Sequence, residues 1–213
     1  MRSSIRSFLT GCCCRATAYL TLRLPELRGV ILTPRIFTTG VKLITALTFF
    51  DIFINHEKSM TVNIDERLDD LGITIPEPRT PSANYIPFVK TGNLVYISGQ
   101  VSMTAYGLIA GKLGLDIDLE TGQKAARACG LNLIAQLKVA CNGTLNQVTR
   151  VVKLGGFVNA TTEFINPPTV INGASDLMVE IFGEAGRHAR FAIGTASLPQ
   201  GAAVEIDGIF EVE

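Results

Sequence analysis

The stretch RHARFAIGTASLPQGAAVEIDGIFEV, residues 187–212, predicts two β-strands joined by a tight turn at Leu198-Pro199. Each of these otherwise apolar strands carries a charged side chain, Arg190 in the first and Glu205 in the second. Two interpretations are open, because opposite charges in an apolar hairpin form either a structural ion pair or part of a functional site. The rest of the chain has to decide between them.

Alternation along the two strands predicts which way the charges point. Side chains of a strand alternate between its two faces, so Phe191 and Ile193 are expected on one face, toward the helices. Arg190 is then expected on the opposite face, and Glu205 on the same face as Arg190, because it alternates with apolar neighbours. This pattern predicts that the charges meet on a sheet face away from the helices.

The preceding residues predict one α+β unit. Apolar residues repeat every three to four positions in two segments, which predicts helices from about 118 or 121 to 142 and from about 168 to 184. Strands are expected at 93–98 and 150–161, a short helix at 65–71 and a hairpin or loop within 101–117. The order predicts a mixed sheet with both helices on one face. Charged and apolar residues share the other face, which favours a subunit contact there.

Composition limits the chain to one main domain and gives no sign of a nucleic-acid partner. The 213 residues are 47% hydrophobic and carry no net charge, which supports one core and no general basic surface. The charge is unevenly divided, because residues 1–59 hold eight basic and three acidic residues and residues 60–213 hold 11 and 16. We therefore expect an N-terminal extension at 1–59 and a domain at 60–213.

The extension allows three interpretations. Its Arg/Ser-rich, acid-poor start is typical of a mitochondrial transit segment. Met60 also opens a run that looks like an ordinary protein start, so the extension is alternatively a mis-assigned upstream start. A membrane-surface segment is the third interpretation, but the longest uncharged run, Leu43 to Phe50, is too short to span a bilayer. We expect a cytoplasmic protein with no membrane partner, or a mitochondrial one if the transit interpretation holds.

Metal and nucleotide motifs are missing from the sequence. The five cysteines form no CxxC pair and no Cys/His ladder, and the two histidines, His56 and His188, lie far apart. There is no P-loop and no GxGxxG motif, and no GxSxG turn accompanies His188. The sequence therefore predicts neither a metal site nor a bound cofactor.

Four segments, in order, carry a resemblance to a known family. They are TGNLVYISGQ (91–100), RVVKLGGFVN (150–159), TVINGAS (169–175) and ARFAIGTASLPQGAAVEIDGI (189–209). From about Tyr85 to Val212 the chain resembles the RidA/YjgF-like reactive-intermediate deaminases, historically labelled endoribonuclease L-PSP, and within them a longer subgroup. The resemblance implies a chorismate-mutase-like fold of the bacillus type, a homotrimer, ligand clefts between subunits and no cofactor.

The resemblance also implies a reaction and a set of site residues. Deaminating members hydrolyse an enamine or imine such as 2-aminoacrylate to a 2-keto acid and ammonia, as 2-iminobutanoate/2-iminopropanoate deaminases do. Arg190 matches the position that binds the substrate carboxylate, for which a guanidinium fork is well suited. Glu205 matches the residue that orients water and accepts its proton. Tyr85, Ser98 and Asn172 match polar residues that line the cleft and bind substrate.

Each of these residues also has a purely structural interpretation. Tyr85 alone suits loop packing, Ser98 a strand end, and Asn172 the first turn of a helix. The sequence departs from the deaminating members at Ala192, where they often carry cysteine, and in the ANYIPF context of the tyrosine. These departures make carboxylate binding a firmer expectation than deamination.

Three functional hypotheses follow. The first is the enamine/imine hydrolase, and the second is a non-catalytic trimer that binds a small carboxylate. The third is an endoribonuclease, which is the weakest because the sequence has no basic stripe, no run of stacking aromatics and no cluster of metal-binding carboxylates.

Overall fold

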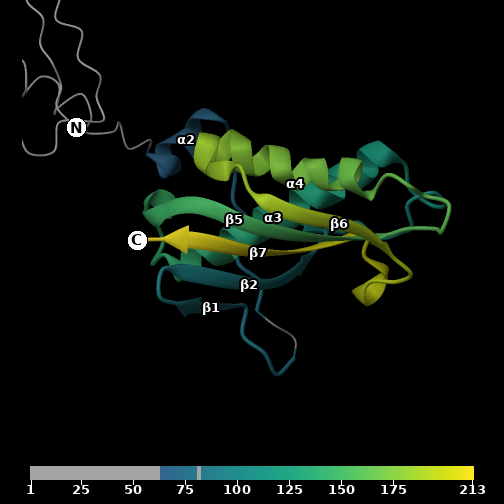
Figure 1. Ribbon diagram of the computed structural model, residues 1–213, viewed down its shortest axis with the longest axis horizontal. Coiled ribbons are helices and arrows are strands. Elements are labelled where there is room, and N and C mark those ends of the chain that lie inside the picture. The colour runs from purple at the N-terminus through teal and green to yellow at the C-terminus, as the bar shows by residue number, and fades with distance from the viewer. Residues whose placement is uncertain (1–62, 81–82) are drawn as a thin grey trace, which may run out of the picture. The chain divides into compact units, whose positions relative to one another are not determined.

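The computed structural model describes residues 63–80 and 83–213, so the predicted extension at 1–59 lies outside the described residues (Figure 1). In chain order the elements are α2 (Ile64–Asp70), β1 (Phe88–Thr91), β2 (Leu94–Val101), β3 (Met103–Thr104), β4 (Gly107–Leu108), α3 (Leu119–Ala140), η2 (Leu145–Gln147), β5 (Val148–Asn159), α4 (Pro167–Phe182), η3 (Gly183–Gly186), β6 (Ala189–Thr195), η4 (Pro199–Gly201) and β7 (Val204–Val212).

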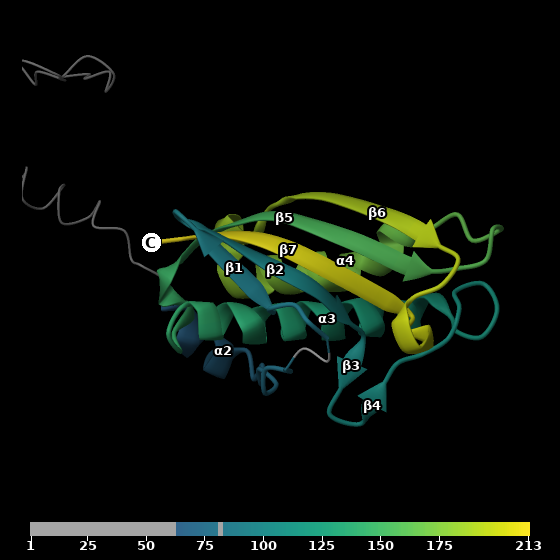
Figure 2. The same cartoon turned by 90° about the horizontal axis from the view of Figure 1, so that it is seen from below.

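The predicted architecture is confirmed. The main sheet has the strand order β1-β2-β7-β5-β6, and it is mixed because β5 and β6 run parallel while the other neighbours run antiparallel. Both long helices, α3 and α4, cover one face of this sheet (Figure 2). The core lies between the two layers, where Leu133, Leu154, Leu177 and Phe210 are completely buried.

Both long helices begin and end at residues whose chemistry explains the boundary. The Asp118 side chain accepts a hydrogen bond from the Thr121 amide and caps α3, and Asn142 in the left-handed region follows its end. Two prolines open α4, where their missing amides cost nothing. Gly173 brings α4 close to α3, since a Cβ at this position would collide with the backbone carbonyl of Gln123.

The predicted hairpin of residues 187–212 is wrong. Strands β6 and β7 are not neighbours, because β5 lies between them and pairs with both. The physical reason is the amphipathic helix α4, which packs on the sheet and returns the chain as a strand parallel to β5, in a β5–α4–β6 crossover. The Leu198-Pro199 segment therefore does not fold β7 back on β6, but carries the chain past the end of β5 to its other side.

The predicted orientation of the first charged strand is also wrong. Arg190 is paired in register with Leu154 of β5, which is completely buried beneath the helices, so Arg190 faces α4. Phe191 points to the opposite, helix-free face, where its ring meets that of Phe157 edge-on with centroids 5.3 Å apart. Glu205 is paired with Phe157 and lies on that helix-free face, as predicted.

A register shift corrects one more assignment. Strict alternation along the strand expected at 150–161 would put Val152 and Leu154 on one face and Val151 on the other. The pairing of β5 with β7 shifts between Val151 and Lys153, so Val151 is the residue that is buried, opposite Phe210. A bulge of this kind inserts one residue and reverses the alternation on one side of it.

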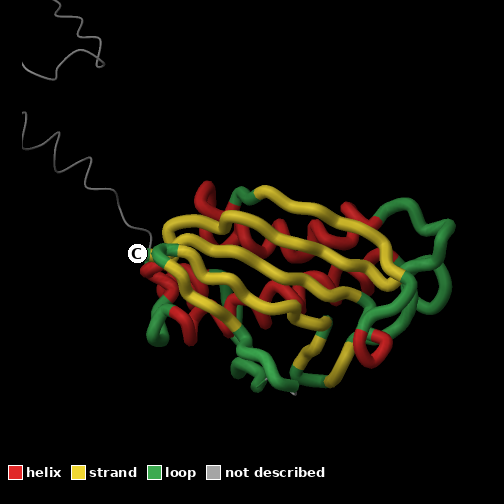
Figure 3. Tube along the Cα trace, turned by 60° about the horizontal axis from the view of Figure 1, so that its bottom comes forward, coloured by secondary structure: helices red, strands yellow, loops and turns green. Residues whose placement is uncertain are grey.

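The helix-free face of the sheet, seen in front of the helices in Figure 3, carries apolar and charged side chains together. Val89, Tyr96 and Ile193 point outward on it and are each between 42% and 49% exposed. Exposed apolar side chains of this size on a sheet face are typical of a protein contact. That another copy of the chain covers it stays a prediction.

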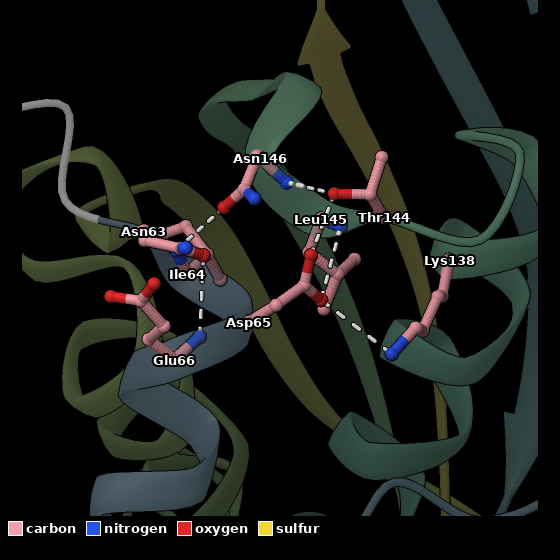
Figure 4. Close-up of polar contacts among 8 residues, drawn as sticks. All are labelled: Asn63, Ile64, Asp65, Glu66, Lys138, Thr144, Leu145 and Asn146. Atoms are coloured by element: carbon pink, nitrogen blue, oxygen red, sulfur yellow. Dashed lines mark hydrogen bonds and ion pairs between the residues drawn. The ribbon is translucent and has the colours of Figure 1, made fainter.

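The short helix α2 and the strand β1 complete the domain. Helix α2 was predicted within one residue of its observed bounds, whereas β1 was not predicted. Asp65 on α2 accepts a hydrogen bond of 2.6 Å from the Thr144 hydroxyl and lies 3.5 Å from Lys138, which fastens α2 to the end of α3 (Figure 4). No helix in the described part of the chain has both the length and the apolar character needed to cross a bilayer.

Candidate functional site

A pocket of about 240 Å³ surrounds Glu205. Its wall comes from four parts of the chain: the connector before β1 (residues 71–80 and 83–87), the end of β2, the buried face of α3 and the η4 turn. Glu205 reaches it from β7, and Tyr85 reaches it from the connector, so the structure brings together two of the predicted site residues. We call this the Glu205 pocket.

The backbone of β2 makes room for the Glu205 carboxylate. The pairing of β2 with β7 is irregular between Ile97 and Gln100, and Gly99 lies in this irregular segment. A Cβ on Gly99 would collide with the carboxylate oxygen of Glu205. Burial raises the pKa of Glu205, and the nearby charge of Asp207, two residues along the same face, raises it further. The carboxylate is thus a better proton acceptor than a solvated one.

Ser98 lies next to the pocket but does not line it. Its hydroxyl donates to the Ile86 carbonyl at 3.0 Å, and its amide donates to the Pro87 carbonyl at 2.9 Å. These bonds fasten the connector to β2 and thereby hold Tyr85, which is 52% exposed, at the pocket. The position predicted for Ser98 is therefore next to the site, but its hydroxyl is used for support.

Most residues of the pocket were missed by the sequence analysis, among them the polar residues Arg79, Asn132 and Gln200. Arg79 comes from the Pro-rich connector, whose carbonyl at this position accepts from Gln136 of α3 at 2.8 Å. The side-chain amide nitrogen of Asn132 on α3 donates hydrogen bonds to the carbonyls of Val101 and Met103. Gln200 lines the pocket with a left-handed backbone, φ +56°. Polar residues on the apolar side of α3 were a usable signal for the pocket, whereas nothing local marks Arg79 or Gln200.

A second cluster forms around Arg190 on the helix side of β6. Its Nη1 donates to the Ser175 hydroxyl at 2.9 Å, and its Nη2 donates to the Pro168 carbonyl at 3.2 Å, both on α4. Asn172 lies four residues after Pro168 and three before Ser175, which puts it on the same helix face. Helix geometry therefore puts Asn172 on the side of α4 that Arg190 contacts.

His188 completes this group, which we call the arginine cluster: Asn172, Ser175, His188 and Arg190. The Nε2 atom of His188 lies 3.1 Å from the Ser175 hydroxyl, and its Nδ1 lies 2.6 Å from the Gly186 carbonyl. From the sequence, His188 either faces the cleft beside Arg190 or is an edge or interface histidine, and the second interpretation was favoured; the structure puts its ring next to the Ser175 hydroxyl that binds Arg190. Its spacing of two residues from Arg190 along a strand was the available signal.

The two clusters are separate within one chain. Arg190 and Glu205 lie two strands apart, or about 10 Å, and their partners on β5 are three residues apart, or about another 10 Å along the strand. Their side chains also leave opposite faces of the sheet. Neither side chain takes part in an ion pair with any other described residue. The interpretation of the two charges as a structural ion pair within the chain is therefore wrong.

No three side chains of His, Cys, Asp or Glu gather into a metal-binding group within residues 63–80 and 83–213. The cysteines of this part, Cys129 and Cys141, are buried and unpaired by disulfide. Burial raises the pKa of the Cys129 thiol well above its ordinary value, with a further contribution from the Glu205 charge. This thiol is therefore a packing group beneath the pocket and not a reactive one.

A mixed five-stranded sheet with two long helices on one face defines the chorismate-mutase-like class of α+β folds. Comparison with known families narrows this further. The chain belongs to the family described as "YjgF/chorismate mutase-like, putative endoribonuclease", whose model matches residues 65–206. The resemblance found in the sequence is thereby confirmed at the level of family and fold.

Three relatives illustrate the range of this family. Protein TCP17 of Trypanosoma cruzi is 45% identical over 147 residues, which is 68% of this chain and 91% of the relative. The crystal structure of protein Atu1372 of Agrobacterium tumefaciens, described as of unknown function, is 46% identical with a TM-score of 0.65, covering 75% of this chain and 99% of that one. A 2-iminobutanoate/2-iminopropanoate deaminase of Dermatophagoides farinae is 27% identical over 143 residues, covering 66% and 95%.

Proposed function

We propose that the protein hydrolyses reactive imines and enamines of small 2-keto acids, such as 2-aminoacrylate, to the keto acid and ammonia. One observation carries the proposal. The domain offers a guanidinium fixed by two hydrogen bonds at one place and a half-buried carboxylate with a raised pKa at another, and no ion pair joins either to a described residue. These are the two groups that hydrolysis of an imino acid requires. The deaminase among the relatives adds support at 27% identity.

The chemistry assigns a different task to each group. The Arg190 guanidinium binds the substrate carboxylate through two parallel hydrogen bonds. Glu205 takes a proton from water as the water oxygen bonds to the imine carbon, and it returns a proton to the nitrogen. The proton of the new hydroxyl group then passes through Glu205 to the nitrogen, the carbon–nitrogen bond breaks, ammonia leaves, and the carbonyl of the keto acid forms. Tyr85 and Asn172 orient the substrate from the two sides.

A complete site then requires two copies of the chain. The arginine cluster lies on β6, the last strand of the sheet, whereas the Glu205 pocket opens toward β2 and the connector near the other edge. We infer a homotrimer in which the arginine cluster of one copy meets the Glu205 pocket of the next. A closed ring uses both edges of every copy, and the helix-free face, with its exposed apolar residues, supplies the contact surface.

The test couples the purified protein to a dehydratase that releases 2-aminoacrylate from serine and follows pyruvate formation. The protein is expected to accelerate pyruvate release, and Arg190→Ala is expected to abolish this acceleration. Arg187→Ala is the matched control, because this exposed arginine of the same segment pairs only with Glu184 among described residues. No acceleration by the parent, or equal rates for parent and Arg190→Ala, would contradict the proposal.

Two further outcomes distinguish the alternatives. Saturable binding of 2-oxobutanoate that needs Arg190 but brings no turnover would identify a non-catalytic carboxylate-binding trimer instead. Cleavage of RNA that survives Arg190→Ala and diminishes with further purification would identify a contaminant, while cleavage that survives purification would favour the nuclease.

A further inference from the structure

The hydrogen bonds of the arginine cluster have a fixed direction. A carbonyl oxygen only accepts, so the contact of 2.6 Å with Gly186 requires the hydrogen on Nδ1 of His188. In the neutral ring Nε2 is then an acceptor, and the Ser175 hydroxyl donates to it at 3.1 Å. The serine oxygen keeps its lone pairs for the Arg190 Nη1 hydrogen at 2.9 Å. The polarity therefore runs from the guanidinium through the hydroxyl and the ring to the carbonyl.

This chain holds the guanidinium at two points. Nη1 is bound to the Ser175 hydroxyl and Nη2 to the Pro168 carbonyl, and both partners belong to the same helix face. A guanidinium has five N–H donors, so three remain for a ligand after these two contacts. Arg190 is otherwise an exposed side chain with large rotamer freedom, which it would have to lose when a carboxylate binds. Fixing it beforehand removes part of that cost.

We propose that Ser175 and His188 are positioning residues that hold Arg190 ready for a carboxylate. The inference rests on the proposed role of Arg190 as the carboxylate-binding group. It adds two residues that act through the guanidinium and do not touch the substrate carboxylate. Helix α4 serves as the rigid support, because Pro168 and Ser175 belong to the same helix and their spacing does not depend on the position of β6.

The charges around His188 give the proposal a measurable signature. Charged side chains on the surrounding elements are Arg190 on β6, Glu184 on η3 and Arg187 directly after it, Asp176 and Glu180 on α4, and Lys153 on β5. Glu184 and Arg187 form an ion pair with each other at 3.0 Å. Glu180 pairs with Arg127 of α3, and Asp176 lines the groove between α3 and α4. Lys153 lies over the Phe191 ring on the opposite face of the sheet. Arg190 is the charge that remains next to the ring.

Burial lowers the pKa of His188, the Gly186 contact opposes this, and the Arg190 charge lowers the pKa further. A carboxylate bound to Arg190 neutralises that charge and must therefore raise the His188 pKa. By linkage, carboxylate affinity must rise as pH falls through the His188 pKa.

The first experiment needs no ligand. Ring ¹⁵N spectra of the full chain are expected to show neutral His188 with hydrogen on Nδ1, and a crystal structure of Ser175→Ala is expected to show the guanidinium in more than one orientation. A hydrogen on Nε2, or an unchanged single orientation in Ser175→Ala, would overturn the inference.

The second experiment uses 2-oxobutanoate as the probe. Calorimetric titration is expected to give an affinity about tenfold weaker for Ser175→Ala, near the loss of one hydrogen bond to a charged group. Ser175→Thr keeps the hydroxyl and is expected to restore the affinity. Asp176→Asn is the matched control, as the adjacent, exposed α4 residue at the α3–α4 groove. Saturating probe is expected to raise the His188 pKa in the parent and not in Arg190→Ala.

These results separate the two proposals. Equal affinities for parent and Ser175→Ala, or a His188 pKa that does not move on saturation, would overturn the positioning role and leave the hydrolase proposal standing. Binding with the expected coupling but without turnover would support the positioning role and contradict hydrolysis. A parent that binds no 2-oxobutanoate would overturn the carboxylate role of Arg190 and the inference with it.

Discussion

Arg190 and Glu205 leave opposite faces of one sheet, on strands that are separated by β5. The guanidinium faces α4 and is bound to it, and the carboxylate lies in a pocket shared with the connector and α3. No rotation of either side chain can bring the two together within one chain. A reaction that needs both must therefore draw them from different copies.

Subunit mixing tests this relationship directly. Arg190→Ala and Glu205→Gln are each expected to be inactive alone, because every site then lacks one group. Co-expressed in equal amounts, they are expected to regain about one quarter of the parent activity, since a random trimer combines an intact Arg190 with an intact Glu205 at that frequency. Activity of the whole co-expressed trimer population is the measurement, and two variants of the same residue provide the control. Mixed trimers that stay inactive would exclude a shared site.

Gly99→Ala is expected to lower kcat strongly while leaving the domain folded. The added Cβ would collide with the Glu205 carboxylate, which would have to leave its place in the pocket. Gly194→Ala is the matched control, because the nearest atom to its Cβ is 3.8 Å away. Both variants are compared in the dehydratase-coupled assay and by thermal unfolding. Full activity in Gly99→Ala would show that the position of this carboxylate is irrelevant to the reaction.

The raised pKa of Glu205 predicts the pH dependence of both activity and stability. As a base Glu205 must be ionised, so kcat/KM is expected to rise as pH increases through its pKa. The folded-state pKa lies above that of the unfolded chain, so the native state binds this proton more tightly. The contribution of Glu205 to the free energy of unfolding therefore falls as pH rises through that window.

The direction of this pKa shift also predicts how Glu205→Gln changes the stability of the domain. At neutral pH this variant is expected to unfold at an equal or higher denaturant concentration than the parent, although it is inactive. Urea unfolding at several pH values measures this difference. A large loss of stability at neutral pH would indicate that the carboxylate supports the fold and was not retained for chemistry.

Asp65→Ala is expected to lower the free energy of unfolding by about 1–2 kcal/mol, because it leaves the Thr144 hydroxyl and the Leu145 amide without their acceptor. Asp69→Ala, an exposed change on the same helix, should have little effect. Urea unfolding of the two variants compares them. Similar stability of both would show that the contacts in Figure 4 contribute no net free energy.

The sequence predicted the bounds of the helices better than it predicted which strands pair with each other. The helices α3 and α4 were located within about two residues because their apolar stripes and end residues agree. The hairpin between β6 and β7 was predicted from short separation along the chain, and that signal says nothing about whether a third strand enters between two others. This one error in pairing also concealed that Arg190 belongs with α4.

For the site, too, the sequence located single residues better than it predicted which of them lie together. Glu205, Tyr85, Arg190 and Asn172 were located from matched segments, yet their grouping into two clusters could not be, because it depends on the face from which each side chain leaves the sheet. Arg79 and Gln200 lie in irregular segments, where no period relates sequence to position. A register shift in β5 reversed the predicted faces of its first half, and nothing in its residues marks that bulge.

The separation of the two clusters has a consequence for regulation by abundance. If a working site needs two copies, the folded monomer is inert, and dilution alone switches the enzyme off without unfolding it. Specific activity would then fall steeply below the concentration at which the ring dissociates. The cell would respond to how much of the chain is assembled, and small changes in expression near that threshold would have large effects on turnover.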